Sequence, residues 1–178
     1  MSSPHDQSHY QVRFDWGVAG VRAVAQDADV IVLVDVLKTS PVLELPDVAA
    51  AVIEGGFRNR TAVAQWVLAH QAEKGDRSYV AVIAAGDARD DGSVRFAVED
   101  LLAAGAIIDA LATAGIDFVS PEGAAACAAF TGLHRAIAHL ATASSSGHEL
   151  TTLGRGDEIA PAIQLDVDTE VLAARRVT

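Results

Sequence analysis

Val30-Ile31-Val32-Leu33-Val34-Asp35-Val36-Leu37 is an almost continuous apolar run that contains one carboxylate. A short run that is apolar on both of its alternating faces is typical of a strand covered on both sides, as in a parallel sheet. Asp35 comes near the end of this run. We therefore expect a central strand over residues 30–36, with Asp35 at its carboxyl end.

Short β-branched runs alternate with alanine-rich helical stretches along the rest of the chain. The pattern predicts further strands over 10–15, 48–53 and 78–84, and a last strand within 171–177. It predicts helices over 18–25, 61–74, 97–114, 121–130, 136–143 and 149–153, with a break in the serine-rich run 144–147. This alternation predicts one α/β domain spanning residues 1–178, a three-layer sandwich with a largely parallel or mixed sheet.

The composition fits a cytoplasmic protein and argues against two classes of partner. A formal charge of −11 and a pI near 4.8 argue against nucleic acid or an anionic membrane as a partner. No apolar run approaches the ~20 residues that span a bilayer, and the polar N-terminus has no signal-peptide pattern. Cys127 is the one cysteine, so no internal disulfide can form. Homo-oligomer formation is left open.

Glu99 and Asp100 are adjacent carboxylates at the start of an alanine-rich helical stretch, after a loop over residues 86–92 that is rich in glycine and acids. One acid suits the positive end of a helix dipole. The second is then free to bind a cation or to move a proton. The alternative is that both are ordinary solvated acids of a first helical turn.

Two more segments carry a recognisable pattern. Residues Gly55-Gly56-Phe57-Arg58-Asn59-Arg60-Thr61-Ala62-Val63-Ala64 indicate a strand end, a polar turn and a helix start, and Ser144-Ser145-Ser146-Gly147-His148-Glu149-Leu150 is serine-rich. Together with Asp35-Val36-Leu37 and the Glu99 block, they resemble the 2-phosphosulfolactate phosphatase family. Its members carry Asp-Val-Leu, Gly-x-x-x-Asn before Ala-Val-Ala, Glu-Asp-x-x-Ala-Ala-Gly-Ala and Ser-x-Gly-x-x-Leu. The resemblance runs from about Val12 to Val177.

The resemblance implies a Mg²⁺-dependent phosphatase that converts 2-phospho-3-sulfolactate to 3-sulfolactate and phosphate. It implies catalytic roles for Asp35, Asn59 and Glu99, and metal binding by Asp35, Glu99 and Asp100. The implied substrate-binding residues are Arg58, Arg95, Gly86, Ser146 and Gly147. Lys38, Arg60 and Arg89 also lie in or beside these segments and complete a candidate anion clamp. The alternatives are a phosphatase for another small phosphorylated acid, or a non-catalytic anion-binding homologue.

The chain departs from the family between about Lys38 and Val48, where an internal segment of the family is missing. No Asn-Gly pair occurs in the chain, although a loop with this pair helps to form the family's site. Either the protein carries a deletion or the sequence omits residues. Because losing a core strand should be very costly, we expect omitted residues.

Ligands of open α/β sheets bind beyond the carboxyl ends of the strands. Asp35, Asn59, Glu99 and Asp100 each follow a predicted strand. We therefore expect all four to line a single cleft at that edge of the sheet.

Overall fold

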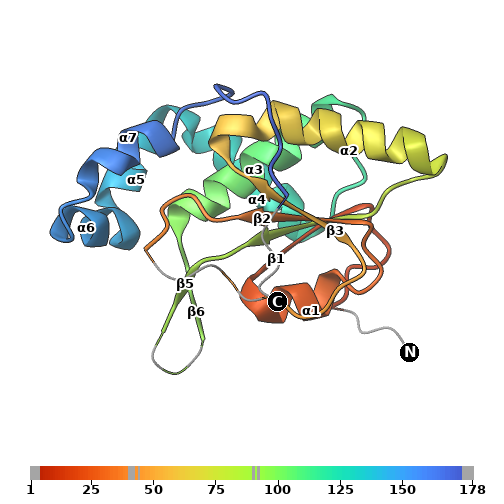
Figure 1. Cartoon of the computed structure of the whole chain (residues 1–178), viewed down its shortest axis with the longest axis horizontal. Coiled ribbons are helices and arrows are strands. Elements are labelled where there is room, and N and C mark those ends of the chain that lie inside the picture. Colours follow the sequence, from red (N-terminus) through yellow and green to blue (C-terminus); the bar gives the residue numbers. More distant parts are fainter. Residues whose placement is uncertain (1–4, 40–42, 44, 90, 92, 174–178) are drawn as a thin grey trace.

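Four parallel strands form the central sheet of the computed structural model, which describes residues 5–39, 43, 45–89, 91 and 93–173 (Figure 1). The strands are β1 (Val12–Trp16), β2 (Val30–Val34), β3 (Ala51–Gly55) and β4 (Val80–Ala84), in the spatial order β1-β4-β2-β3. Their last residues are in register, because Ala84 pairs with both Trp16 and Val34, and Val34 pairs with Gly55. All four strands therefore end at one edge.

Helices cover both faces of the sheet, which confirms the predicted three-layer α/β sandwich (Figure 1). One face packs against α1 (Gly17–Val24). The other packs against α2 (Arg60–Lys74), α3 (Val98–Thr113) and α4 (Pro121–Leu133). The buried residues of β2 are apolar on both faces, as the sequence predicted, since Val32 belongs to one core and Ile31 to the other.

Three short helices close the carboxyl edge of the sheet. These are α5 (Ile137–Ala143), α6 (Ser145–Thr152) and α7 (Ile159–Ala162). Leu37, which follows β2, is buried in a small cluster with Ala141, Leu150 and Ile159, so each of these helices packs near the end of the central strand. Short 3₁₀ turns over Phe57–Asn59 (η1), His134–Ala136 (η2) and Gly156–Glu158 (η3) connect the helices and strands.

Described residues of the connection from β2 to β3 pack on the same face of the sheet as α1. Parallel neighbours need a crossover, which is usually helical. Here Leu43, Leu45 and Val48 of the connection pack directly on the core beside α1. Residues 40–42 and 44 lie outside the described residues, so the expectation of a missing segment between Lys38 and Val48 is untested.

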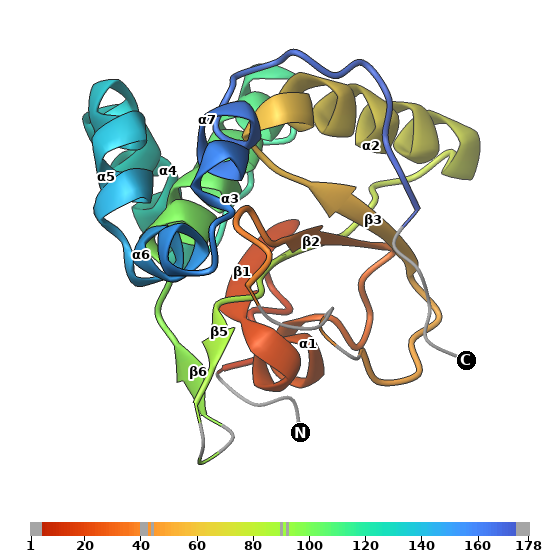
Figure 2. The same cartoon turned by 60° about the vertical axis from the view of Figure 1, so that its left-hand side comes forward.

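The sequence prediction missed several short elements. No helix was predicted at α7, and two other segments also differed from the prediction. A loop was predicted over 86–92, but the chain forms a hairpin of β5 (Asp87–Ala88) and β6 (Val94–Arg95) that projects from the body (Figure 2). A break was predicted over 144–147, but α6 begins there. Ser144 is its N-cap and accepts a hydrogen bond from the Gly147 amide at 3.0 Å. Serine is common both in loops and at helix starts, so composition alone did not separate the two.

The segment after α7 returns across the carboxyl edge to the outer strand. We call residues 164–173 the C-terminal strap. The strap makes one antiparallel bridge, Ala173 to Ile53, and the Glu54 amide donates to the Leu172 carbonyl at 2.9 Å. Of the strand predicted within 171–177, the described residues 171–173 contribute this bridge; residues 174–178 lie outside the described part, so the rest of that prediction is untested. In the residues that the structure describes, no helix has the length and apolar character needed to span a membrane.

Candidate active site

Asp35 stands directly after β2 and lines two adjoining cavities. The first, which we call the Glu99 cavity, has a volume of about 450 Å³, and Glu99, Asp100 and Ser146 also line it. The second, which we call the Arg58 cavity, has a volume of about 480 Å³. Asp35 is therefore the residue that both cavities share.

The carboxyl of Asp35 is hard to ionise. Burial raises its pKa from 3.8 to about 6; the nearby Lys38 charge opposes this shift, while Glu54 and Glu99 add to it. A group with this pKa exchanges a proton easily near neutral pH, which is the property that acid–base catalysis needs.

Asp100 ties together the ends of two strands. Its Oδ1 accepts a hydrogen bond from the Val36 amide at 2.8 Å, and its Oδ2 accepts one from the Gly86 amide at 2.9 Å. Burial, reinforced by the Asp35 charge, raises the Asp100 pKa well above its ordinary value. Asp100 therefore holds the segments after β2 and β4 in fixed positions beside Asp35.

Glu99 differs from Asp100, because one oxygen of its carboxylate accepts no hydrogen bond from the described residues. The side chain is almost fully buried, and its Oε2 has no hydrogen-bond partner among the described residues. Such an atom is costly unless something binds to it. Mg²⁺ commonly binds one or two carboxylates together with water and substrate oxygens. Asp35 and Glu99, which line the same cavity, fit that requirement.

The predicted metal set of Asp35, Glu99 and Asp100 stays a prediction. Within the described ranges, no group of three or more His, Cys, Asp or Glu side chains is arranged to hold a metal ion. Both oxygens of Asp100 already accept backbone amides. The fit to a cation thus rests on two carboxylates rather than three.

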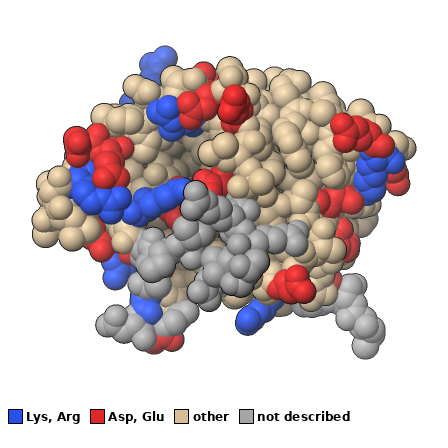
Figure 3. All heavy atoms as spheres, in the orientation of Figure 1, with Lys and Arg blue, Asp and Glu red and all other residues tan. Residues whose placement is uncertain are grey.

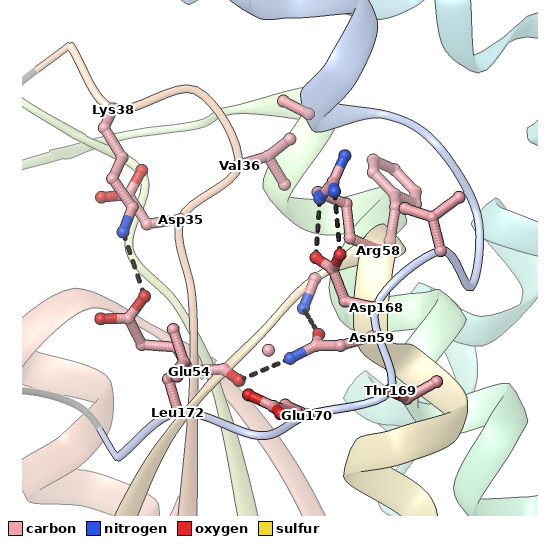
Figure 4. Close-up of a pocket in the computed structure, with 15 residues that line it drawn as sticks. Asp35, Val36, Lys38, Glu54, Arg58, Asn59, Asp168, Thr169, Glu170 and Leu172 are labelled. Carbon is pink, nitrogen blue, oxygen red and sulfur yellow. Dashed lines mark hydrogen bonds and ion pairs between the residues drawn. The ribbon is translucent and has the colours of Figure 1, made fainter.

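Asn59 holds the turn between β3 and α2. Its Oδ1 accepts from the Gly56 amide at 3.0 Å, and its Nδ2 donates to the Glu54 carbonyl at 3.1 Å. Figure 4 shows this side chain at the wall of the Arg58 cavity. These hydrogen bonds stabilise the turn, and the predicted catalytic role of Asn59 is untested.

The basic residues predicted as an anion clamp are largely paired with acids. Lys38 binds Glu54 at 3.1 Å and Arg58 binds Asp168 at 2.8 Å, both around the Arg58 cavity (Figure 4). The space-filling view likewise shows basic side chains beside acidic ones on this face rather than in a patch of their own (Figure 3). An incoming anion therefore meets neutralised cations.

Three other predicted cations line neither cavity. Arg60 binds Asp166 at 2.8 Å and Asp109 at 3.2 Å. Arg95 was predicted to bind substrate. Its Nη1 lies 3.7 Å from Oδ2 of Asp87 on the other strand of the hairpin, so its side chain pairs with that acid. Arg89 is exposed on the same hairpin.

Two of the small residues predicted to bind substrate are glycines that the local structure requires. The Gly86 amide is already used by Asp100, and its φ of +62° favours glycine. Gly147 lines neither cavity, and a Cβ there would lie 2.1 Å from the Ala141 carbonyl oxygen. Ser146, by contrast, is buried and lines the Glu99 cavity.

The expected single cleft is thus two cavities joined at Asp35. Glu99 and Asp100 line one cavity, and Asn59 lines the other. The sequence analysis missed the acids that line the Arg58 cavity. Glu54, Asp168 and Glu170 carry no local motif, and only the path of the C-terminal strap brings the last two there.

A family model described as 2-phosphosulpholactate phosphatase matches residues 39–176. The matched range includes Asn59, Glu99 and Asp100, and Asp35 lies just before it. The comparison with curated proteins gives no match.

Proposed function

Since the chain belongs to the 2-phosphosulpholactate phosphatase family, we propose that it hydrolyses 2-phospho-3-sulfolactate to 3-sulfolactate and phosphate with Mg²⁺ as cofactor. The family makes the protein a phosphatase. The observation that carries the proposal is that Asp35, which both cavities share, lines the same cavity as Glu99, whose Oε2 has no partner among the described residues.

Phosphate monoesters resist hydrolysis so strongly that no single group accounts for their enzymatic cleavage. The phosphoryl group needs positive charge around its oxygens and a nucleophile in line with the leaving group. Asp35 and Glu99 would hold the ion, which when bound supplies positive charge to the phosphoryl oxygens. Asp35 serves either as this ligand or as the nucleophile, and both roles require its carboxylate.

The remaining residues fix the geometry. Asp100 holds the segments that follow β2 and β4 in place through the Val36 and Gly86 amides. Asn59 holds the turn that forms the wall of the Arg58 cavity. Preorganised groups of this kind accelerate a reaction because they need not rearrange as charge develops.

Phosphate release after removal of divalent ions, followed by addition of Mg²⁺, tests the proposal. We expect Mg²⁺ to restore activity on 2-phospho-3-sulfolactate. Asp35→Asn keeps the side-chain volume but removes the charge, so it should lower turnover by ~10²–10³. Asp117→Asn is the matched control, because Asp117 is an exposed acid far from the site. It lies two residues before Val119, which pairs with the first residue of β1, at the edge of the sheet opposite to Asp35.

Each outcome has a separate meaning. Release from other small phosphorylated acids but not from 2-phospho-3-sulfolactate would show that the substrate is wrong. A wild type that releases phosphate from none of them would support a non-catalytic homologue. Unchanged turnover in Asp35→Asn would remove Asp35 from the mechanism.

A further inference from the structure

The Arg58 cavity has an unusual balance of charge. Lys38 and Arg58 line it, but so do Asp35, Glu54, Asp168 and Glu170. Among the described residues, two cations thus face four acids, although the proposed substrate carries anionic groups besides its phosphate. An anion can bind here only if at least one cation exchanges its present partner for the ligand.

Arg58 is arranged for such an exchange. Its Nε and Nη2 donate to the two oxygens of Asp168 at 2.8 and 2.9 Å, which is the bidentate geometry that also suits a sulfonate or a carboxylate of a ligand. Its Nη1 donates separately to the Pro161 carbonyl at 2.6 Å. The guanidinium would therefore keep its orientation after Asp168 has left.

The pair with Asp168 is also replaceable. The Arg58 side chain is 36% exposed and that of Asp168 is 44% exposed, so water screens the pair and offsets part of the strength of its bidentate geometry. Asp168 can release Arg58 without freeing its backbone, because its amide donates to the Arg58 carbonyl at 2.8 Å. Asp166 anchors the same strap independently through Arg60 and the Thr61 amide.

From this geometry we propose that the Arg58 cavity is a subsite for the second anionic end group of the substrate, a sulfonate or carboxylate, and that Asp168 occupies its place on Arg58 in the free protein. The proposal rests on the proposed function for the identity of the substrate. With the phosphate beside Asp35 and Glu99, the rest of the molecule reaches the Arg58 cavity, since Asp35 borders both. Asp168 is then a specificity-determining residue, because only a ligand with an anionic end group can replace it.

Calorimetric titration with 3-sulfolactate tests the subsite without any need for turnover. Asp168→Asn removes the competing charge and should tighten binding by roughly threefold to tenfold. Asp166→Asn is the matched control, because it weakens the same strap at an arginine outside the cavity, and it should not tighten binding. Arg58→Gln should weaken binding at least tenfold, and thermal melts establish that each variant is folded.

Isethionate, which has a sulfonate but no carboxylate, and lactate, which has the reverse, identify the group that Arg58 receives. The ligand whose affinity rises in Asp168→Asn carries that group. Equal affinities in Asp168→Asn and Asp166→Asn, or wild-type affinity in Arg58→Gln, would overturn the subsite even if the enzyme cleaves its proposed substrate. Tighter binding in Asp168→Asn alone would support the subsite even if that substrate is not cleaved.

Discussion

Ionisation of Asp35 lowers the stability of the folded protein. Its folded pKa is about 6 against an ordinary 3.8, mainly because of burial, so the fold favours the protonated carboxyl. The stability that this preference contributes is fully present below about pH 4 and is lost as the pH rises through about 6. At neutral pH without divalent cations, the charged side chain therefore destabilises the protein.

We predict that Asp35→Asn melts at a higher temperature than the wild type at pH 7 in the presence of a chelator. A gain of about 1–2 kcal/mol corresponds to roughly 3–6 °C for a chain of this size. The difference should disappear near pH 4, where Asp35 is neutral in the wild type. Thermal melts at both pH values measure it, and a lower melting temperature at pH 7 would assign Asp35 a structural role.

At the scale of elements, α3 and α4 pack closely against each other at Gly105. A Cβ on this residue would lie 2.1 Å from the Ala126 carbonyl oxygen, so the backbone of α4 leaves no room for a side chain. Gly105→Ala should therefore destabilise the protein by about 1–3 kcal/mol, despite the better helix propensity of alanine. Urea unfolding measures the loss.

Gly132 in α4 provides the comparison. A Cβ there meets nothing within 4 Å, so Gly132→Ala should be neutral or stabilising by up to ~1 kcal/mol. If both variants lost stability equally, the effect at Gly105 would not come from the contact between the helices.

The elements that the sequence predicted well are those with a long local pattern. The apolar run of β2, and the long helices α2 and α3, appear close to their predicted positions. The β5–β6 hairpin was missed because two-residue strands are too short to show an alternation. Capping by Ser144 was missed because the same residue type marks both loops and helix starts.

At the scale of the whole molecule, the net charge of −11 repels an anionic substrate. Salt screens this repulsion, with a Debye length of about 30 Å at 0.01 M and about 10 Å at 0.1 M. We therefore predict that kcat/KM for 2-phospho-3-sulfolactate rises roughly twofold or more over this range at fixed Mg²⁺. Initial-rate measurements in KCl test this, and a steady fall from the lowest salt would show that local cations control the encounter.

The candidate site could be predicted only where its residues sit in local motifs. Asp35, Glu99 and Asp100 follow strands, and the topology places them together at one edge of the sheet. The partner of Arg58 could not be predicted, because Asp168 lies 110 residues further along the chain and carries no motif. Sequence reasoning therefore counted Arg58 as an available cation, although folding pairs it.

In the part of the chain that the structure describes, each of the two outer strands of the sheet makes short backbone contacts with a distant segment. Val119 bridges to Val12 on β1, and Ala173 bridges to Ile53 on β3. An uncovered strand edge is a template on which another chain can add a strand. By occupying backbone groups of the outer strands, these contacts oppose aggregation through strand pairing. A chain shortened to end at Asp166 would uncover β3. Its light scattering should then grow with protein concentration, while the full chain remains clear under the same conditions.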